Sequence, residues 1–112
     1  MSAQVNAGKK ANGNGNGLVS RGDGVFEASG RMTFQTVPQF LASTAIWLND
    51  TTGAVTIDLG KITLADSAGV ALMLEWLREA RVAKRKLEFV NFPEQVQHLI
   101  RVSGLSDVFG LA

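Results

Sequence analysis

The feature that most constrains this chain is a short turn between an apolar strand pattern and its longest helical pattern. Residues 54–59 are β-branched and apolar, which is typical of a central strand. We expect the chain to turn through residues 61–65, after which Asp66-Ser67-Ala68-Gly69-Val70 opens a helix running to about residue 84. Ser67 is the predicted N-cap, because a hydroxyl there accepts a hydrogen bond from a first-turn N–H. A polar group is then presented at the positive end of a helix dipole.

Length and composition limit the domain organisation. The 112 residues are enough for one domain with one packed core. Residues 1–17 are rich in Asn, Gly and Ala, so we predict a disordered tail over residues 1–22 and a single folded domain over residues 23–112. The N-terminus also lacks the apolar core of a signal peptide, and no apolar run is long enough to span a bilayer.

The remaining patterns alternate between strand and helix. Residues 24–30 alternate as a half-buried strand, and a turn at Gly30-Arg31 would lead to a second short strand over residues 32–34. A helix is expected over residues 37–48 with Thr36 as its N-cap, then a strand over residues 87–92 and a helix over residues 94–102. The predicted class is α/β, with a mixed four- to five-stranded sheet and about three to four helices.

Composition removes several kinds of chemistry. The chain has no cysteine and a single histidine, His98, which we assign to a helix surface, so thiolate and histidine-rich metal sites are excluded. A net charge of +1 is too small to imply a nucleic-acid partner. The basic residues at positions 78–86 are interpreted as a solvated helix end, with an anionic-ligand patch as the alternative.

Two carboxylates are candidates for converging near the Ser67 turn. Asp58 and Asp66 could together bind a metal or perform acid–base chemistry, but the alternative is ordinary loop and N-cap hydrogen bonding. We therefore predict no catalytic residue, no metal site and no cofactor, and we assign Asp58, Asp66 and Gly69 a supporting role in the turn. Ser67 has three interpretations: a cap alone, a phosphorylation site, or a contact hydroxyl in an interface.

The helix after the turn is apolar over more than one face, although a helix on a sheet needs only one apolar stripe. Leu72 and Trp76 fall off that stripe, four residues apart. They either tuck under a neighbouring helix or form an exposed patch that docks a partner, with Trp76 as the anchor and Arg78 pairing with an acidic group. The hypothetical docking surface consists of Ser67, Ala68, Val70, Ala71, Leu72, Leu74, Glu75, Trp76 and Arg78.

These motifs resemble the STAS domain family, over residues 24 to about 109. The resemblance rests on Gly30 with Met32-Thr33, on residues 55–59, on the Asp66–Val70 turn, and on Val90-Asn91-x-Pro93 followed by Ser103-Gly104-Leu105. It implies a STAS-like single domain whose turn serine contacts a partner protein.

Two branches of the family compete. Residues 72–76 and 89–93 look most like the MlaB-type subunit, which binds the cytoplasmic ATPase of an inner-membrane ABC transporter that moves phospholipids and maintains outer-membrane lipid asymmetry. That resemblance implies a non-catalytic, cytoplasmic protein held at the membrane through its partner, with Ser67 at the ATPase contact. The SpoIIAA-type anti-sigma-factor antagonist is the alternative, in which the serine matching Ser67 is phosphorylated by the anti-sigma-factor kinase.

Overall fold

A four-stranded mixed sheet organises the molecule, for which a computed structural model describes residues 16–50 and 53–111. The strands are β2 (Gly17–Gly22), β3 (Val25–Met32), β4 (Val55–Ala65) and β5 (Leu87–Val90), in the spatial order β2-β3-β4-β5. β2 and β3 form an antiparallel hairpin, whereas β4 is parallel to both β3 and β5. The predicted α/β class with a mixed sheet is therefore confirmed.

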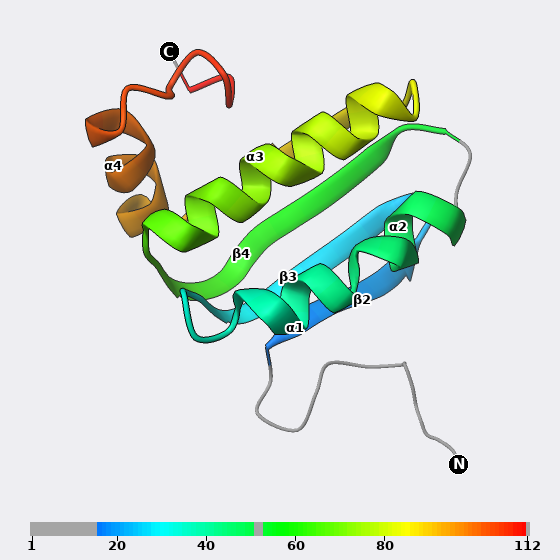
Figure 1. The fold of residues 1–112 in the computed structure, drawn as a ribbon, viewed down its shortest axis with the longest axis horizontal. Helices are drawn as coiled ribbons and strands as arrows, with labels where there is room; N and C mark the ends of the chain where they lie inside the picture. The colour runs from blue at the N-terminus through cyan, green and yellow to red at the C-terminus, as the bar shows by residue number, and fades with distance from the viewer. Residues whose placement is uncertain (1–15, 51–52, 112) are drawn as a thin grey trace.

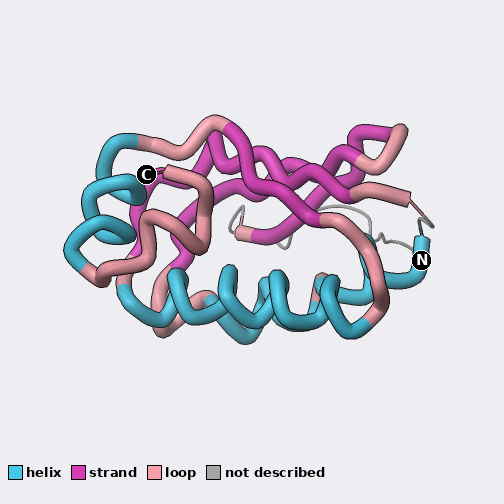
Figure 2. Tube along the Cα trace, turned by 90° about the horizontal axis from the view of Figure 1, so that it is seen from above, coloured by secondary structure: helices cyan, strands magenta, loops and turns pink. Residues whose placement is uncertain are grey.

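Three helices lie along one face of the sheet. α1 (Val37–Ala42) and α2 (Thr44–Asp50) connect β3 to β4, and α3 (Ser67–Val82) connects β4 to β5. Figures 1 and 2 show these helices as one layer and the strands as a second layer, with α4 (Glu94–Val102) at one end. Each parallel connection thus carries its helix on the same side, which buries one face of the sheet.

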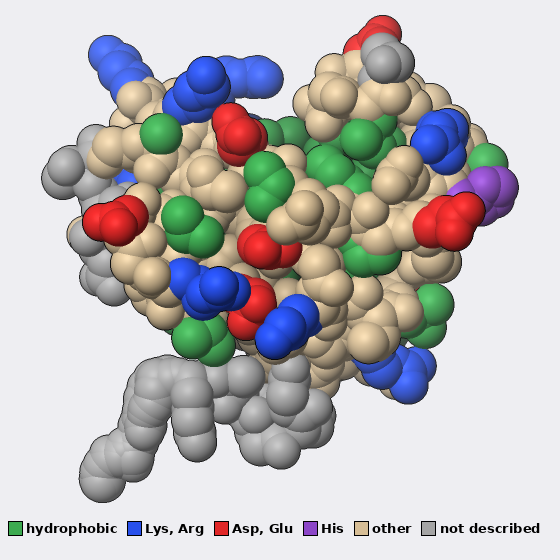
Figure 3. All heavy atoms as spheres, turned by 180° about the vertical axis from the view of Figure 1, so that it is seen from behind, with side chains coloured by type: hydrophobic (Ala, Val, Ile, Leu, Met, Phe, Trp, Pro, Cys, Tyr) green, Lys and Arg blue, Asp and Glu red, His purple; other side chains and the backbone are tan. Residues whose placement is uncertain are grey.

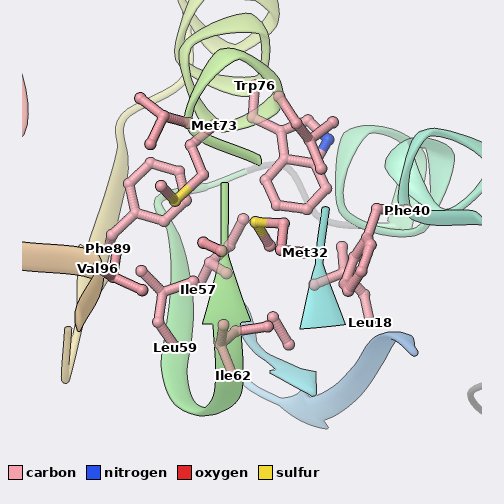
Figure 4. Close-up of a cluster of buried hydrophobic side chains, with 14 of the residues drawn as sticks. Leu18, Met32, Phe40, Ile57, Leu59, Ile62, Met73, Trp76, Phe89 and Val96 are labelled. Carbon is pink, nitrogen blue, oxygen red and sulfur yellow. The ribbon is translucent and has the colours of Figure 1, made fainter. Parts of the chain in front are cut away.

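The core fills the space between the two layers (Figure 4). Its side chains come from alternate strand positions such as Phe26, Ile57 and Leu59, because successive strand residues point to opposite faces. Met73 and Trp76 of α3 meet them from above. Burial of this apolar surface is the main stabilising term for a domain of this size.

The N-terminal half differs from the prediction in three places. The predicted tail extends too far, since Gly17 already begins β2; residues 1–15 lie outside the described residues. The predicted turn at Gly30 is wrong because β3 runs on to Met32, and its hairpin partner is β2 rather than residues 32–34. The predicted helix over residues 37–48 is divided at Ser43, whose hydroxyl donates back to the Gln39 carbonyl.

Thr36 precedes α1 as predicted, but its hydroxyl does not cap the helix. It accepts from the backbone N–H of Thr33 and donates to the Arg31 carbonyl, which ties the end of β3 to the start of α1. The C-terminal half follows the prediction closely: α4 ends at Val102, and Gly104 adopts a positive φ of 75° just beyond it.

β4 is longer than its sequence pattern indicates. The turn predicted for residues 61–65 is instead the second half of this strand, which pairs with β3 up to Ala65 across two register shifts. In this second half of β4, buried residues no longer alternate strictly with exposed ones, because the register shifts interrupt the period of two. β4 therefore delivers the Asp66–Ser67 turn to one end of the sheet.

Candidate functional site

Asp66, not Ser67, is the N-cap of α3. Its Oδ1 accepts hydrogen bonds from the backbone N–H groups of Ala68 at 2.9 Å and Gly69 at 3.1 Å. Its Oδ2 accepts a third from the N–H of Phe34 at 3.0 Å. One carboxylate therefore satisfies two helix-terminal donors and binds the β3–α1 loop to the start of α3.

Ser67 consequently occupies the first position of α3, with its side chain exposed. Within the described part of the chain, no hydrogen bond engages its hydroxyl, whereas Asp66 supplies the capping interaction. The prediction that Ser67 is the cap is therefore wrong by one residue. The hydroxyl is left available, beside a carboxylate and at the positive end of a 16-residue helix.

Gly69 allows this turn to lie directly against β3. A Cβ at Gly69 would stand 2.2 Å from the Met32 carbonyl oxygen and 3.0 Å from the Met32 Cγ. The N–H of Asp66 also donates to that Met32 oxygen, at 3.3 Å. The supporting role predicted for Gly69 is thus explained by the close approach of the first turn of α3 to the end of β3, which leaves no room for a Cβ.

An apolar surface that the sequence analysis missed adjoins the turn. Phe34 is 79% exposed and Leu64 39% exposed, and both line a hollow of about 360 Å³ together with Arg31 and Asp66. The sequence analysis placed Phe34 in a short strand over residues 32–34 and Leu64 in a turn over residues 61–65, so it predicted neither side chain at this surface. Exposed aromatic side chains beside an available hydroxyl are typical of a docking surface.

Leu72 and Trp76 do not form the exposed patch predicted as one alternative. Their side chains are 3% and 0% exposed, so they belong to the core. The Trp76 Nε1 donates to the Thr44 hydroxyl at 2.9 Å, and its ring lies edge-on to Phe40 and stacks near Phe89. The other alternative is therefore confirmed: α1 and α2 cover this side of α3, and Trp76 cannot anchor a partner on the folded domain.

The outer face of α3 retains part of the predicted docking surface. Ser67, Ala71 and Arg78 are exposed, and the remaining members that reach the surface are half-buried, namely Ala68, Leu74 and Glu75. Val70 is buried. The reduced surface is a narrow strip of small and polar side chains that begins at the Ser67 turn.

Arg78 is already paired within its own helix. Its guanidinium contacts Glu75 at 2.5 Å and Glu79 at 3.0 Å. The hydrogen bond from Arg78, with a smaller contribution from Glu79, holds the pKa of Glu75 below its usual value, and the same pairing raises the pKa of Arg78. An acidic partner group would have to compete with these two carboxylates, so Arg78 is a weaker candidate than its position suggested.

Asp58 and Asp66 do not converge as predicted. The two lie eight residues apart along a continuous strand, or up to about 25 Å at the usual rise per residue. Asp58 accepts instead from the N–H of Gly60. Across residues 16–50 and 53–111, no three potential ligands gather where a metal ion could bind. His98 is exposed on α4, as assigned.

Comparison with models of known protein families identifies the family to which the chain belongs. The family model described as "Mlab, STAS domain" matches residues 19–111. The chain therefore belongs to the MlaB-type STAS domain family. No curated protein matches it in sequence.

The fold agrees with that class. A solved structure of the anti-sigma factor antagonist SpoIIAA in its unphosphorylated form superposes with a TM-score of 0.63. The two chains share 20% identity, and the match covers 80% of this chain and 81% of the other. At this identity the likeness establishes the STAS fold and nothing finer.

Proposed function

We propose that this chain is a non-catalytic binding subunit that docks the cytoplasmic ATPase of an inner-membrane ABC transporter for phospholipids. The site used is the Ser67 turn, with the exposed strip of α3 and the neighbouring Phe34 and Leu64. Membership of the MlaB-type family supports the partner class and a cytoplasmic position against the membrane. Among the described residues, no helix is both long and apolar enough to cross a bilayer.

The proposal rests on one observation: Asp66 makes the hydrogen bonds that fix the turn, whereas the Ser67 side chain is exposed and makes none among the described residues. Asp66 holds the turn through three backbone hydrogen bonds, so the exposed Ser67 hydroxyl has no structural task. A rigid polar group flanked by exposed apolar side chains resembles the rim and centre of a protein interface. Phe34 takes the anchoring role that the sequence analysis gave to Trp76.

The second candidate is an anti-sigma-factor antagonist regulated at Ser67. A phosphate there would gain from the N-terminal dipole of α3 but would lie next to the Asp66 carboxylate. Arg31 is the one cation among the described residues that line the adjoining hollow. A phosphate would add about two negative charges and would change which partner the turn accepts.

An affinity purification from native cells separates the two candidates. The tagged full chain would be recovered and analysed by mass spectrometry, together with the phosphorylation state of Ser67. Ser20→Asp is the matched control for Ser67→Asp, because Ser20 is also exposed and lies on the distant hairpin strand β2. Recovery of an ABC ATPase with wild type and Ser20→Asp, but not with Ser67→Asp, supports the transporter subunit.

Recovery of a kinase or sigma-factor regulator, with phosphate on Ser67, would replace the first candidate by the second. Loss of partner binding in Phe34→Ser as well as Ser67→Asp is expected in either case, because both residues border the same turn. Binding that is unaffected by Ser67→Asp and Phe34→Ser would remove this surface from both proposals.

A further inference from the structure

A basic groove lies at the opposite end of α3 from the Ser67 turn. It has a volume of about 740 Å³ and is bounded by the last turns of α3, the start of β5 and the C-terminal segment. Seventeen residues of helix and turn separate Ser67 from Lys84, which corresponds to about 25 Å at 1.5 Å per residue. Leu74 and Arg78 belong both to this groove and to the exposed strip of α3, but the Lys84 end of the groove lies far from the Ser67 turn.

The groove combines cations on its walls with apolar side chains beneath them. Arg81, Lys84 and Lys86 are exposed, and the half-buried Leu74, Leu77 and Leu87 line the interior. Figure 3 shows this hollow at the upper edge of the face, with apolar side chains between the blue cationic groups and the projecting C-terminal segment. A solvated helix end needs the cations but not the apolar floor.

None of these three cations takes part in an ion pair within the described part of the chain. The ion pairs there are those of Arg21 and Lys61 with Glu27, and of Arg78 with Glu75 and Glu79. Arg85 differs, because its guanidinium donates to the carbonyls of Trp47, Leu48 and Gly53 and so has a structural task. The groove therefore presents three exposed cations that make no ion pair among the described residues, in a molecule whose net charge is only +1.

β5 adds main-chain groups to the same groove. It is an edge strand, and the Val55 N–H bonds to the Lys86 carbonyl. In a parallel ladder this register points the N–H and C=O of Leu87 away from β4. An extended peptide could use these outward groups.

We propose that this groove binds a short acidic segment of a partner protein that also carries apolar side chains. Charge complementarity identifies the occupant: the carboxylates meet Arg81, Lys84 and Lys86, while the apolar side chains cover Leu74, Leu77 and Leu87. The chain's own residues 1–15 are unsuitable, since they contain Lys9 and Lys10 and no acidic residue. A lipid chain is less suitable because the groove is open along one side and would leave it in water.

Fluorescence anisotropy with the full chain tests this. The probe is a labelled twelve-residue peptide of Leu and Asp in alternating pairs, so that each face of an extended peptide carries both. We expect saturable binding that weakens about tenfold in the double variant Arg81→Glu/Lys86→Glu. The charge-matched control, Lys61→Glu/Arg101→Glu, changes exposed cations outside the groove and should leave the affinity within about twofold. Circular dichroism establishes that both variants fold.

Several outcomes would overturn the proposal. Equal weakening in the two double variants would show diffuse charge attraction rather than a site. Equal binding of a peptide with Ser in place of Leu would remove the apolar floor from recognition. Binding of vesicles with one part phosphatidylglycerol to three parts phosphatidylcholine, without binding of the peptide, would assign the groove to an anionic membrane surface. Binding that persists when salt rises from about 50 to 300 mM would also contradict it.

Discussion

Replacing Gly69 by alanine tests whether the site is fixed by contact between backbones. Helix propensity alone predicts that Gly69→Ala stabilises the protein, by about 1 kcal/mol in a helix interior. The structure predicts the opposite sign. The new Cβ would stand 2.2 Å from the Met32 oxygen, so the first turn of α3 and the end of β3 must separate by about 1 Å to reach normal contact.

The magnitude follows from two opposing terms. Overpacking of this kind costs about 1–3 kcal/mol, and more where a rigid backbone atom is struck, while the gain in helix propensity returns up to about 1 kcal/mol. We expect a net loss of about 1–2 kcal/mol, or about 5–15 °C in the midpoint of thermal unfolding for a domain of this length.

Urea unfolding followed by tryptophan fluorescence measures this directly, because Trp47 and Trp76 are both buried. Gly53→Ala is the matched control, since a Cβ at Gly53 meets nothing within 4 Å and its backbone requires no positive φ. That variant should be neutral or slightly stabilised. A Gly69→Ala variant as stable as wild type, with an unchanged dependence on urea, would refute the close approach at this turn.

Three further predictions concern α3. Asp66→Ala should lower the free energy of unfolding by about 1–2 kcal/mol in urea titrations because it removes the N-cap, and a loss under about 0.5 kcal/mol would contradict the capping role. Trp76→Ala should cost about 3–5 kcal/mol or unfold the domain, as seen by calorimetry, and a loss under about 1 kcal/mol would contradict its place in the core. Arg78 lowers the pKa of Glu75 from its usual 4.5, so the paired carboxylate stabilises the fold above that value and loses this contribution as the pH falls through the lowered pKa. Wild type should therefore exceed Glu75→Gln slightly in stability at pH 6, and the difference should shrink as the pH falls below 4.5 and through the lowered pKa; a difference that widens in acid would reverse the sign.

The sequence predicts a strand that leads through a turn into α3, but it assigns the N-cap of α3 to the wrong residue. Asp66 and Ser67 are both good N-cap residues, and local pattern cannot decide between neighbours. The decision comes from the Phe34 N–H, 32 positions away, which binds the second oxygen of Asp66. Only the folded chain brings that donor to the turn.

Trp76 shows a similar limit. An apolar stripe reveals that a helix is buried on one side, but a second apolar side is equally compatible with a neighbouring helix or with an exposed patch. The break at Ser43 turns α2 so that Thr44 meets the indole N–H. Hence the residue expected to dock a partner is part of the core, and Phe34, a residue with no periodic signal, is exposed beside the turn.

The central claim is that the Ser67 turn is the docking surface of a binding subunit. Once the ATPase partner has been purified, isothermal titration calorimetry of wild type, Ser67→Asp and Ser20→Asp tests it most directly. The account predicts that wild type and Ser20→Asp bind with the same affinity and that Ser67→Asp binds at least about tenfold more weakly, because a buried unpaired charge at an interface costs more than 1.4 kcal/mol. Equal affinity of all three proteins would contradict it.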